Sequence, residues 1–152
     1  MDVKTDDAGM IEKALSMALM AHAGQKDKYG APYVLHPLRV GLGGESAAEI
    51  ASGFLHDVIE DTPKTVDHLR GEGFPEEVLT IVDHLTKREG EGWEAYIHRV
   101  MEHEPSMRVK LRDLAHNMDA TRIPEFGEKD ADRFARYVWA WHEIRSTLGG
   151  NE

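Results

Sequence analysis

The stretch LHDVIEDT, residues 55–62, combines one histidine and three carboxylates with an apolar stripe. On a helix, His56 and Glu60 lie four residues apart, as do Asp57 and Asp61, so each pair shares one side. Carboxylates near a helix C-terminus oppose its macrodipole, and such a violation of a local rule is typical of functional sites. The alternative is a helix end with solvated acids. The adjacent His56 and Asp57 could supply two metal ligands, which Glu60 and Asp61 would flank.

The pattern around this stretch predicts an all-α protein. Ser46 is a candidate N-cap, with Glu49 at capping-box spacing, for a helix that runs to Glu60. Apolar residues at spacings of three and four predict further helices at residues 10–22, 36–42, 65–70, 75–87, 92–102, 105–121 and 129–148. No segment alternates over four or more residues as a strand would. We expect residues 1–152 to form a single domain around one core.

The composition excludes several classes of function. The chain has no cysteine, which removes disulfides, thiol nucleophiles and Cys-ligated zinc. It has neither an apolar run long enough to span a membrane nor the basic and apolar regions of a signal peptide, so we expect a cytosolic protein. The net charge of −10 disfavours a nucleic-acid partner, which would select a basic face. Nine histidines make a metal site a stronger hypothesis.

Other stretches offer further candidates for the same site. His36 stands before Pro37 at the start of a predicted helix, and in isolation it would be a structural histidine. Asp113 and Asn117 lie four residues apart on the predicted helix at 105–121, so they face the same way. Four basic residues could either gather around a small anionic ligand or be mere surface charge: Lys26, Lys28, Arg39 and Lys110.

Taken together, these stretches resemble the HD-domain metal-dependent phosphohydrolases, whose pattern is a distant His, an adjacent His-Asp and a later Asp. The resemblance is closer to the hydrolase domain of RelA/SpoT proteins and to the small stand-alone alarmone hydrolases similar to metazoan SpoT homologue. It is carried by HAGQKDKYGAPYVLHP (22–37), FLHDVIEDT (54–62), VDHLTK (82–87) and VKLRDLAHNM (109–118). It spans about residues 18–122, and the remainder reads as one amphipathic helix, so no synthetase domain is expected. Aromatic residues of that helix, Phe134, Tyr137, Trp139 and Trp141, are expected in the core.

The resemblance implies an HD-type helical bundle and an enzyme of the stringent response. Such an enzyme removes the 3′-pyrophosphate from guanosine tetra- or pentaphosphate, giving GDP or GTP. It implies one Mn²⁺ ion, although Fe²⁺, Co²⁺ or Zn²⁺ would also suit the donor set. The implied metal ligands are His36, His56, Asp57 and Asp113, and the implied catalytic acids are Glu60 and Asp61. The implied substrate contacts are Lys28, Asn117, Tyr33 and His116, with Asp27 at a departure from the family, while His22 is expected to order the loop after the first helix.

That departure concerns the base. The family commonly has Arg-Lys where this chain has Asp27-Lys28, and the Arg packs against guanine, which a carboxylate cannot do. The segment after Asp113 also lacks two family arginines and an in-register threonine. A (p)ppApp hydrolase, an NADPH 2′-phosphatase or another HD nucleotide phosphatase, and a non-catalytic nucleotide sensor are therefore alternatives. Restoring Arg at position 27 is expected to shift preference toward ppGpp.

Overall fold

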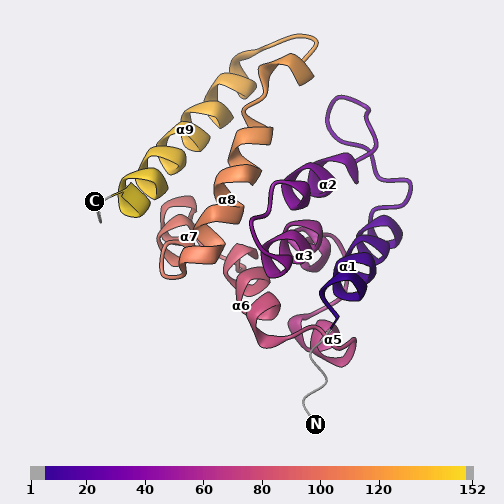
Figure 1. Ribbon diagram of the computed structural model, residues 1–152. Helices are drawn as coiled ribbons and strands as arrows, with labels where there is room; N and C mark the ends of the chain where they lie inside the picture. The colour runs from indigo at the N-terminus through magenta and orange to yellow at the C-terminus, as the bar shows by residue number, and fades with distance from the viewer. Residues whose placement is uncertain (1–5, 150–152) are drawn as a thin grey trace.

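The computed structural model describes residues 6–149, which fold into a bundle of helices joined by short loops (Figure 1). The helices are α1 (Asp7–Ala21), α2 (Leu35–Leu42), α3 (Ala47–Leu55), α4 (Val58–Asp61), α5 (Val66–Gly71), α6 (Glu76–Leu85), α7 (Trp93–Val100), α8 (Glu104–Asn117), the 3₁₀ helix η1 (Ala120–Arg122) and α9 (Glu128–Gly149). Within those residues the only β-type pairing is an isolated bridge between Lys26 and Pro32. The all-α prediction is confirmed.

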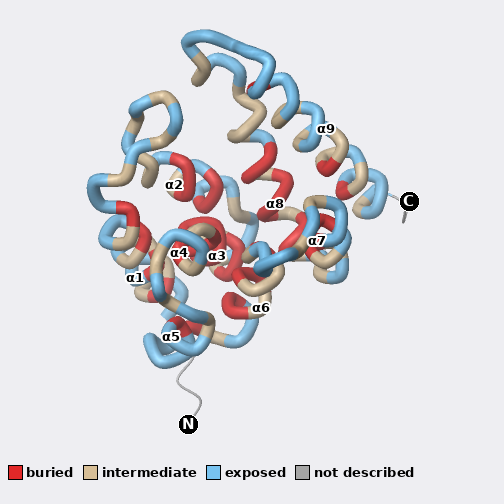
Figure 2. The backbone as a smooth tube through the Cα atoms, turned by 180° about the vertical axis from the view of Figure 1, so that it is seen from behind, coloured by how far each residue is buried: buried red, intermediate tan, exposed pale blue. Residues whose placement is uncertain are grey.

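Helix α3 lies at the centre of the bundle and packs against α1, α2, α6 and α8. All but two of its residues are buried, and Phe54 and Leu55 at its end are among the largest fully buried side chains. Figure 2 shows many of the buried residues gathered on α2, α3, α6 and α8, with exposed residues around them. The core therefore surrounds the helix that ends at His56.

The contact between α2 and α3 requires two glycines. A Cβ atom built on Gly53 would lie 2.6 Å from the Cα of Gly41, and one on Gly41 would lie 2.2 Å from Phe54 Cδ1. Neither position has room for a side chain, so the two backbones touch. Because α2 carries His36 and α3 leads into His56, this approach fixes how far apart the two histidines lie.

The prediction of one helix over residues 46–60 is wrong. Helix α3 ends at Leu55, and the chain turns through His56 and Asp57 before the short helix α4 begins at Val58. The imidazole of His56 explains the interruption, because its Nδ1 donates to the carbonyl of Gly53 at 2.6 Å. A side chain thus takes the acceptor that a continuing helix would use for its main-chain N–H. The break separates His56, the C-cap of α3, from Glu60 on α4, whereas Asp57 caps α4 and its carbonyl accepts from the main-chain nitrogen of Asp61 at 3.0 Å.

Capping of α3 agrees in part with the prediction. Ser46 Oγ accepts a hydrogen bond from the main-chain nitrogen of Glu49 at 3.1 Å, as an N-cap should. The Glu49 carboxylate, however, accepts from Arg112 Nη1 at 3.0 Å and Arg108 Nε at 3.3 Å. The reciprocal half of the capping box is replaced by ion pairs that join α3 to α8.

Helix α9 packs along α8, and Figure 1 shows the two side by side. It matches the predicted helix at 129–148 and buries Ala140 and Ile144. The predicted helix at 105–121 ends earlier, at Asn117, and is followed by η1. Across residues 6–149, no helix has both the length and the apolar character that crossing a bilayer would demand.

Candidate metal centre and nucleotide cavity

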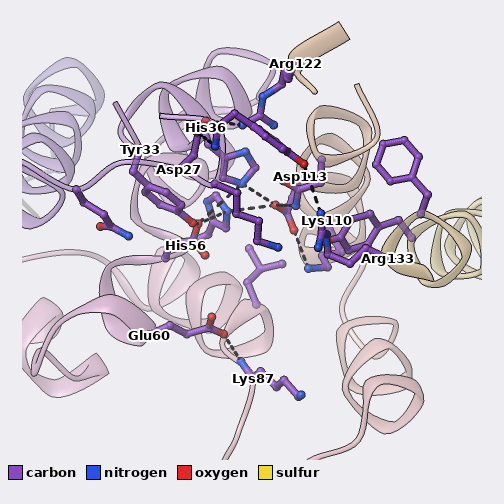
Figure 3. Close-up of a pocket in the computed structure, with 18 of the residues that line it drawn as sticks. Asp27, Tyr33, His36, His56, Glu60, Lys87, Lys110, Asp113, Arg122 and Arg133 are labelled. Atoms are coloured by element: carbon purple, nitrogen blue, oxygen red, sulfur yellow. Dashed lines mark hydrogen bonds and ion pairs between the residues drawn. The ribbon is translucent and has the colours of Figure 1, made fainter. Parts of the chain in front are cut away.

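Two histidine nitrogens and two carboxylates converge where α2, α3 and α8 meet (Figure 3). His36 Nε2 lies 2.8 Å from Asp113 Oδ1 and 3.8 Å from Asp57 Oδ2. His56 Nε2 lies 3.2 Å from Asp57 Oδ2 and 3.5 Å from Asp113 Oδ1. The sequence placed these four residues up to 77 positions apart, and the fold brings all of them together.

The second nitrogen of each imidazole is held by another group. His56 Nδ1 donates to the Gly53 carbonyl, and His36 Nδ1 lies 2.7 Å from His116 Nδ1. Both rings therefore turn Nε2 toward the carboxylates. His56 Nε2 is buried and has no hydrogen-bond partner among residues 6–149. A buried polar atom in this condition calls for an explanation, and a bound cation is one.

Neighbouring side chains hold the two carboxylates in place. The Tyr33 hydroxyl donates to Asp57 Oδ2 at 2.5 Å. Lys110 Nζ donates to Asp113 Oδ2 at 2.6 Å, and Asn117 Nδ2 donates to Asp113 Oδ1 at 3.1 Å. Tyr33 and Asn117, both expected as substrate contacts, thus contact the carboxylates of the proposed metal site.

Opposite charges dominate the electrostatics of this cluster. Burial alone would lower the pKa of His56, but the carboxylates of Asp57 and Asp113 raise it well above its usual value. Burial would raise the pKa of Asp57, yet His56 brings it down to about 2. Lys110 and the two histidines hold the pKa of buried Asp113 well below its usual value. Both carboxylates are thus ionised at neutral pH, as metal ligands must be.

The donor set fits a divalent cation. Ligand atoms of His36, His56 and Asp57 lie within 4.8 Å of one another, and Asp113 borders the same point. Two imidazole nitrogens and two carboxylate oxygens, without a thiolate, suit first-row divalent metals. Each imidazole has the outer hydrogen bond that orients histidine ligands in metal sites. We conclude that this cluster could hold a divalent metal ion.

A cavity of about 390 Å³ opens over the cluster and has a basic lining. Its walls include His36, His56, Asp57 and Asp113. Six cationic residues also line it: Lys26, Lys28, Lys87, Lys110, Arg122 and Arg133. In a chain with a net charge of −10, this local excess of cations suits a small anionic ligand.

Aromatic side chains form part of the cavity lining, which corrects one expectation. Phe134 on α9 was expected in the core but lines the cavity. Tyr137, Trp139 and Trp141 pack against the hydrophobic core as expected, and Tyr137 also lines the cavity together with Trp93 and Tyr96 of α7. The spacing of aromatic residues on α9 could not separate these two groups, because the groove beside α7 exists only in the folded chain.

The two predicted catalytic acids occupy different surroundings. Glu60 lines the cavity, and its Oε1 accepts from the main-chain nitrogen of Lys87 at 2.7 Å (Figure 3). Partial burial raises the pKa of Glu60. Asp61 Oδ2 instead accepts from Gln25 Nε2 at 3.2 Å and lies 3.6 Å from His22 Nδ1. Glu60 is thus placed toward the cavity and Asp61 toward the loop after α1.

The loop after α1 is ordered by its own polar residues. His22 is buried, and its Nδ1 lies 2.8 Å from Gln25 Oε1, in agreement with its expected ordering role. Asp27 Oδ1 accepts from the main-chain nitrogens of Tyr29 and Ala31 at 2.9 and 3.0 Å. Its Oδ2 accepts from Arg122 Nη2 at 3.3 Å. Asp27 therefore holds the loop, while its neighbour Lys28 lines the cavity with an exposed side chain.

The structure places three cationic residues at the site in positions that the sequence did not predict. Lys110, which could have been surface charge, is buried beside Asp113. Arg122 follows α8 on η1 and brings a guanidinium to the cavity although the family arginines after Asp113 are missing. Arg133 reaches the cavity from α9 and forms an ion pair with Asp130. Only the tertiary arrangement of α9 and η1 could have indicated the two arginines.

Sequence comparisons find relatives over about three quarters of the chain. A GTP pyrophosphokinase of Myxococcus xanthus is 36% identical over 130 residues, which cover 74% of this chain and 17% of that protein. A guanosine-3′,5′-bis(diphosphate) 3′-pyrophosphohydrolase of Aquifex aeolicus is 33% identical over 118 residues, 72% of this chain and 17% of that protein. The chain thus spans about a sixth of the length of these relatives. No family model matches it.

The structural comparison agrees with the sequence relatives. The chain matches a solved structure described as a metazoan ortholog of SpoT that hydrolyzes ppGpp. The TM-score is 0.73 with 21% identity, and the match covers 94% of this chain and 89% of the other. Fold and site together define an HD-type helical bundle with a histidine–aspartate cluster. Within that class, the resemblance to hydrolases of the RelA/SpoT type is confirmed.

Proposed function

We propose that this chain is a Mn²⁺-dependent hydrolase that removes pyrophosphate from the 3′-position of guanosine 3′,5′-bis(diphosphate) or its pentaphosphate analogue. The observation that carries the proposal is the convergence of His36, His56, Asp57 and Asp113 at the floor of a cation-lined cavity. A site for a divalent cation beneath a basic cavity suits a substrate with several phosphates. The names of the relatives support this substrate class.

The reaction consumes one water for each substrate. The water oxygen attacks the phosphorus that is attached to the ribose 3′-oxygen. The bond between this phosphorus and the 3′-oxygen breaks, and pyrophosphate is released. The 3′-oxygen gains a proton and becomes a hydroxyl, so guanosine tetraphosphate gives GDP. The bound cation would lower the pKa of water and offset charge on the phosphoryl oxygens.

The cavity residues have distinct roles in this proposal. Glu60 accepts the proton of the attacking water, since its carboxylate faces the cavity and its raised pKa makes it a better base. Lys28 and Arg133 contact the phosphates, with Lys26, Lys87 and Arg122 adding positive charge around them. Asn117 holds Asp113 and borders the substrate. Asp61 acts through Gln25, which it holds at the cavity edge.

The base has an aromatic and cationic environment without the family arginine at position 27. Phe134 and Tyr137 of α9 line the cavity, and Tyr29 and Arg133 line it as well. Aromatic faces and a guanidinium can stack on either purine. Arg122, held by Asp27, supplies a guanidinium near the loop that carries Lys28. We infer that these side chains replace the missing Arg as a stacking surface, and the names of the relatives make a guanine nucleotide the expected substrate.

The experiment that tests the proposal is pyrophosphate release from ppGpp, ppApp and NADPH, measured side by side with Mn²⁺ and with EDTA. We expect Mn²⁺-dependent release of pyrophosphate from ppGpp. Release of pyrophosphate from ppApp alone would make the adenine nucleotide the substrate. Release of phosphate from NADPH alone would make the protein a 2′-phosphatase. Bound Mn²⁺ without turnover of any of the three would favour a nucleotide sensor.

A further inference from the structure

His116 lies behind the proposed metal ligand His36 and away from the nucleotide cavity. The two Nδ1 atoms are 2.7 Å apart, and the ring planes differ by 11°. The ring centroids are 5.0 Å apart, so the imidazoles meet edge to edge along one hydrogen bond. His116 lines a second cavity, on the other side of the cluster, with Arg39, Arg112 and Asp119. His116 is absent from the lining of the nucleotide cavity, and its role as a substrate contact stays a prediction.

Only one proton can lie between the two Nδ1 atoms, and its owner can be deduced. A guanidinium has no lone pair to offer, so Arg122 Nη1, which lies 3.3 Å from His116 Nδ1, can only donate. That nitrogen of His116 must therefore be an acceptor. His36 Nδ1 then carries the proton and donates to His116, so Nε2, which lies 2.8 Å from Asp113 Oδ1, is the nitrogen through which His36 would bind a metal ion.

Other groups around His116 favour the same assignment. Arg122 Nη1 also donates to the main-chain carbonyl of His116 at 2.9 Å, which holds the guanidinium against this residue. With Nδ1 as an acceptor, the proton of a neutral His116 lies on Nε2.

We propose that His116 is a positioning residue for His36, which fixes the tautomer and ring orientation with which His36 can bind a metal ion. The inference deepens the proposed function and rests on its metal site. It gives the two histidines different supports, because His56 is held by the Gly53 carbonyl and His36 by a side chain. A main-chain carbonyl is not removed by a side-chain substitution, whereas one substitution at His116 removes the hydrogen-bond partner of His36.

The hydrogen bonds of Arg122 also connect His116 to the loop that carries Lys28. Arg122 contacts His116 through one end of its guanidinium and Asp27 Oδ2, at 3.3 Å, through Nη2. Asp27 in turn binds the main chain of Tyr29 and Ala31. The loop that carries Lys28 and the ligand His36 are thus held by one connected set of hydrogen bonds.

The test compares His116→Asn with His116→Gln in the full chain. Both substitutions introduce an amide, but the Asn oxygen can occupy the place of Nδ1, whereas the longer Gln side chain carries its amide beyond it. We expect His116→Gln to bind Mn²⁺ about 10- to 100-fold more weakly, the range for loss of an outer partner of a metal ligand. His116→Asn should stay within about threefold of the unmodified chain. His142→Asn, an exposed site on α9, is the matched control.

Mn²⁺ binding is measured by electron paramagnetic resonance without nucleotide, and unfolding in EDTA checks that each variant folds. Equal Mn²⁺ affinity in the Gln variant and the unmodified chain would overturn the proposal, as would equal losses in the Asn and Gln variants. If the Gln variant does not fold, His116→Leu replaces it with the same expected loss. Mn²⁺ binding without nucleotide hydrolysis would overturn the hydrolase alone, whereas no Mn²⁺ binding by the unmodified chain would overturn both.

Discussion

Lys110 Nζ lies 2.6 Å from Asp113 Oδ2 inside the bundle, and both side chains are almost completely buried. The ammonium also lies 3.2 Å from the Tyr96 hydroxyl and 4.9 Å from the centre of its ring. A buried ammonium is stable only with such partners. This cation offsets the negative charge that two carboxylates would otherwise concentrate at the proposed metal site.

Replacing Lys110 by Met should therefore destabilise the metal-free protein by about 3–5 kcal/mol, the usual cost of removing one partner of a buried ion pair. Mn²⁺ would restore part of this loss, because the metal supplies positive charge at Asp113. The measurement is urea unfolding of both proteins in EDTA and in Mn²⁺. An equal loss under the two conditions would show that Lys110 does not share the charge of Asp113 with a metal.

Glu60→Gln should separate chemistry from metal binding. The Gln side chain can still accept from the Lys87 nitrogen but cannot take a proton from water, so turnover should fall about 10²- to 10⁴-fold. Mn²⁺ affinity should stay unchanged, whereas His56→Ala and Asp57→Ala should lose metal and activity together. Turnover and Mn²⁺ binding are measured on the same preparations. A Glu60→Gln variant that loses the metal would make Glu60 a ligand instead.

Asp27→Arg tests whether this position selects the base or holds the loop. The sequence alone predicted a shift toward ppGpp, but the Asp27 carboxylate accepts from Tyr29, Ala31 and Arg122. We now expect a lower kcat/KM, by about tenfold or more, for ppGpp and ppApp alike. Asp27→Asn keeps an oxygen for the main-chain donors and should lose less. A changed ratio of the kcat/KM values for ppGpp and ppApp would show that residue 27 selects the base.

The contact between α2 and α3 should be intolerant of one methyl group. A Cβ at position 53 would lie 2.6 Å from Gly41 Cα, so Gly53→Ala must move one helix and with it His36 or His56. We expect a loss of about 2 kcal/mol or more in unfolding free energy. Mn²⁺ binding should weaken as well. Gly71→Ala on α5, where no atom beyond the local helix lies within 4 Å of the new Cβ, is the control and should leave Mn²⁺ binding unchanged without lowering the unfolding free energy.

Apolar spacing predicted the helices, whereas the resemblance to HD-domain phosphohydrolases implied the four-residue cluster. His36, His56, Asp57 and Asp113 stand in stretches whose apolar neighbours define the helix faces, and the fold brings these residues together. The break at His56 escaped prediction because a side-chain hydrogen bond to Gly53 replaces a helical one. Helix propensity does not include the competition between a side chain and the main chain for one carbonyl acceptor.

The cavity walls were less predictable than its floor. Three aromatic residues of α9, Tyr137, Trp139 and Trp141, pack against the core, and only the placement of this helix decides that Phe134 and Tyr137 line the cavity. The positions of Arg122 and Lys110 could not be predicted either. A basic residue on the surface and one beside a carboxylate inside the fold look alike in sequence. Partners far apart in the chain decide such positions.

Arg99 fixes the loop that leads from α6 to α7. Its guanidinium donates to the Glu91 carboxylate at 2.8 and 2.9 Å and to the Thr86 carbonyl at 2.7 Å. The next residue, Lys87, presents its main-chain nitrogen to Glu60. This ion pair thus supports the position of the proposed general base from outside the cavity.

The same ion pair should give acid-dependent stability. The hydrogen bond from Arg99 lowers the pKa of Glu91 from 4.5 to about 2. A depressed carboxyl pKa stabilises the fold above the unfolded value, and the contribution is lost as pH falls toward the folded value. Glu91→Gln should therefore cost about 1 kcal/mol at pH 7, with the difference from the unmodified protein shrinking between about pH 4.5 and 2. Urea unfolding of both proteins across this range measures it, and a difference that is independent of pH would assign the effect to packing instead of charge.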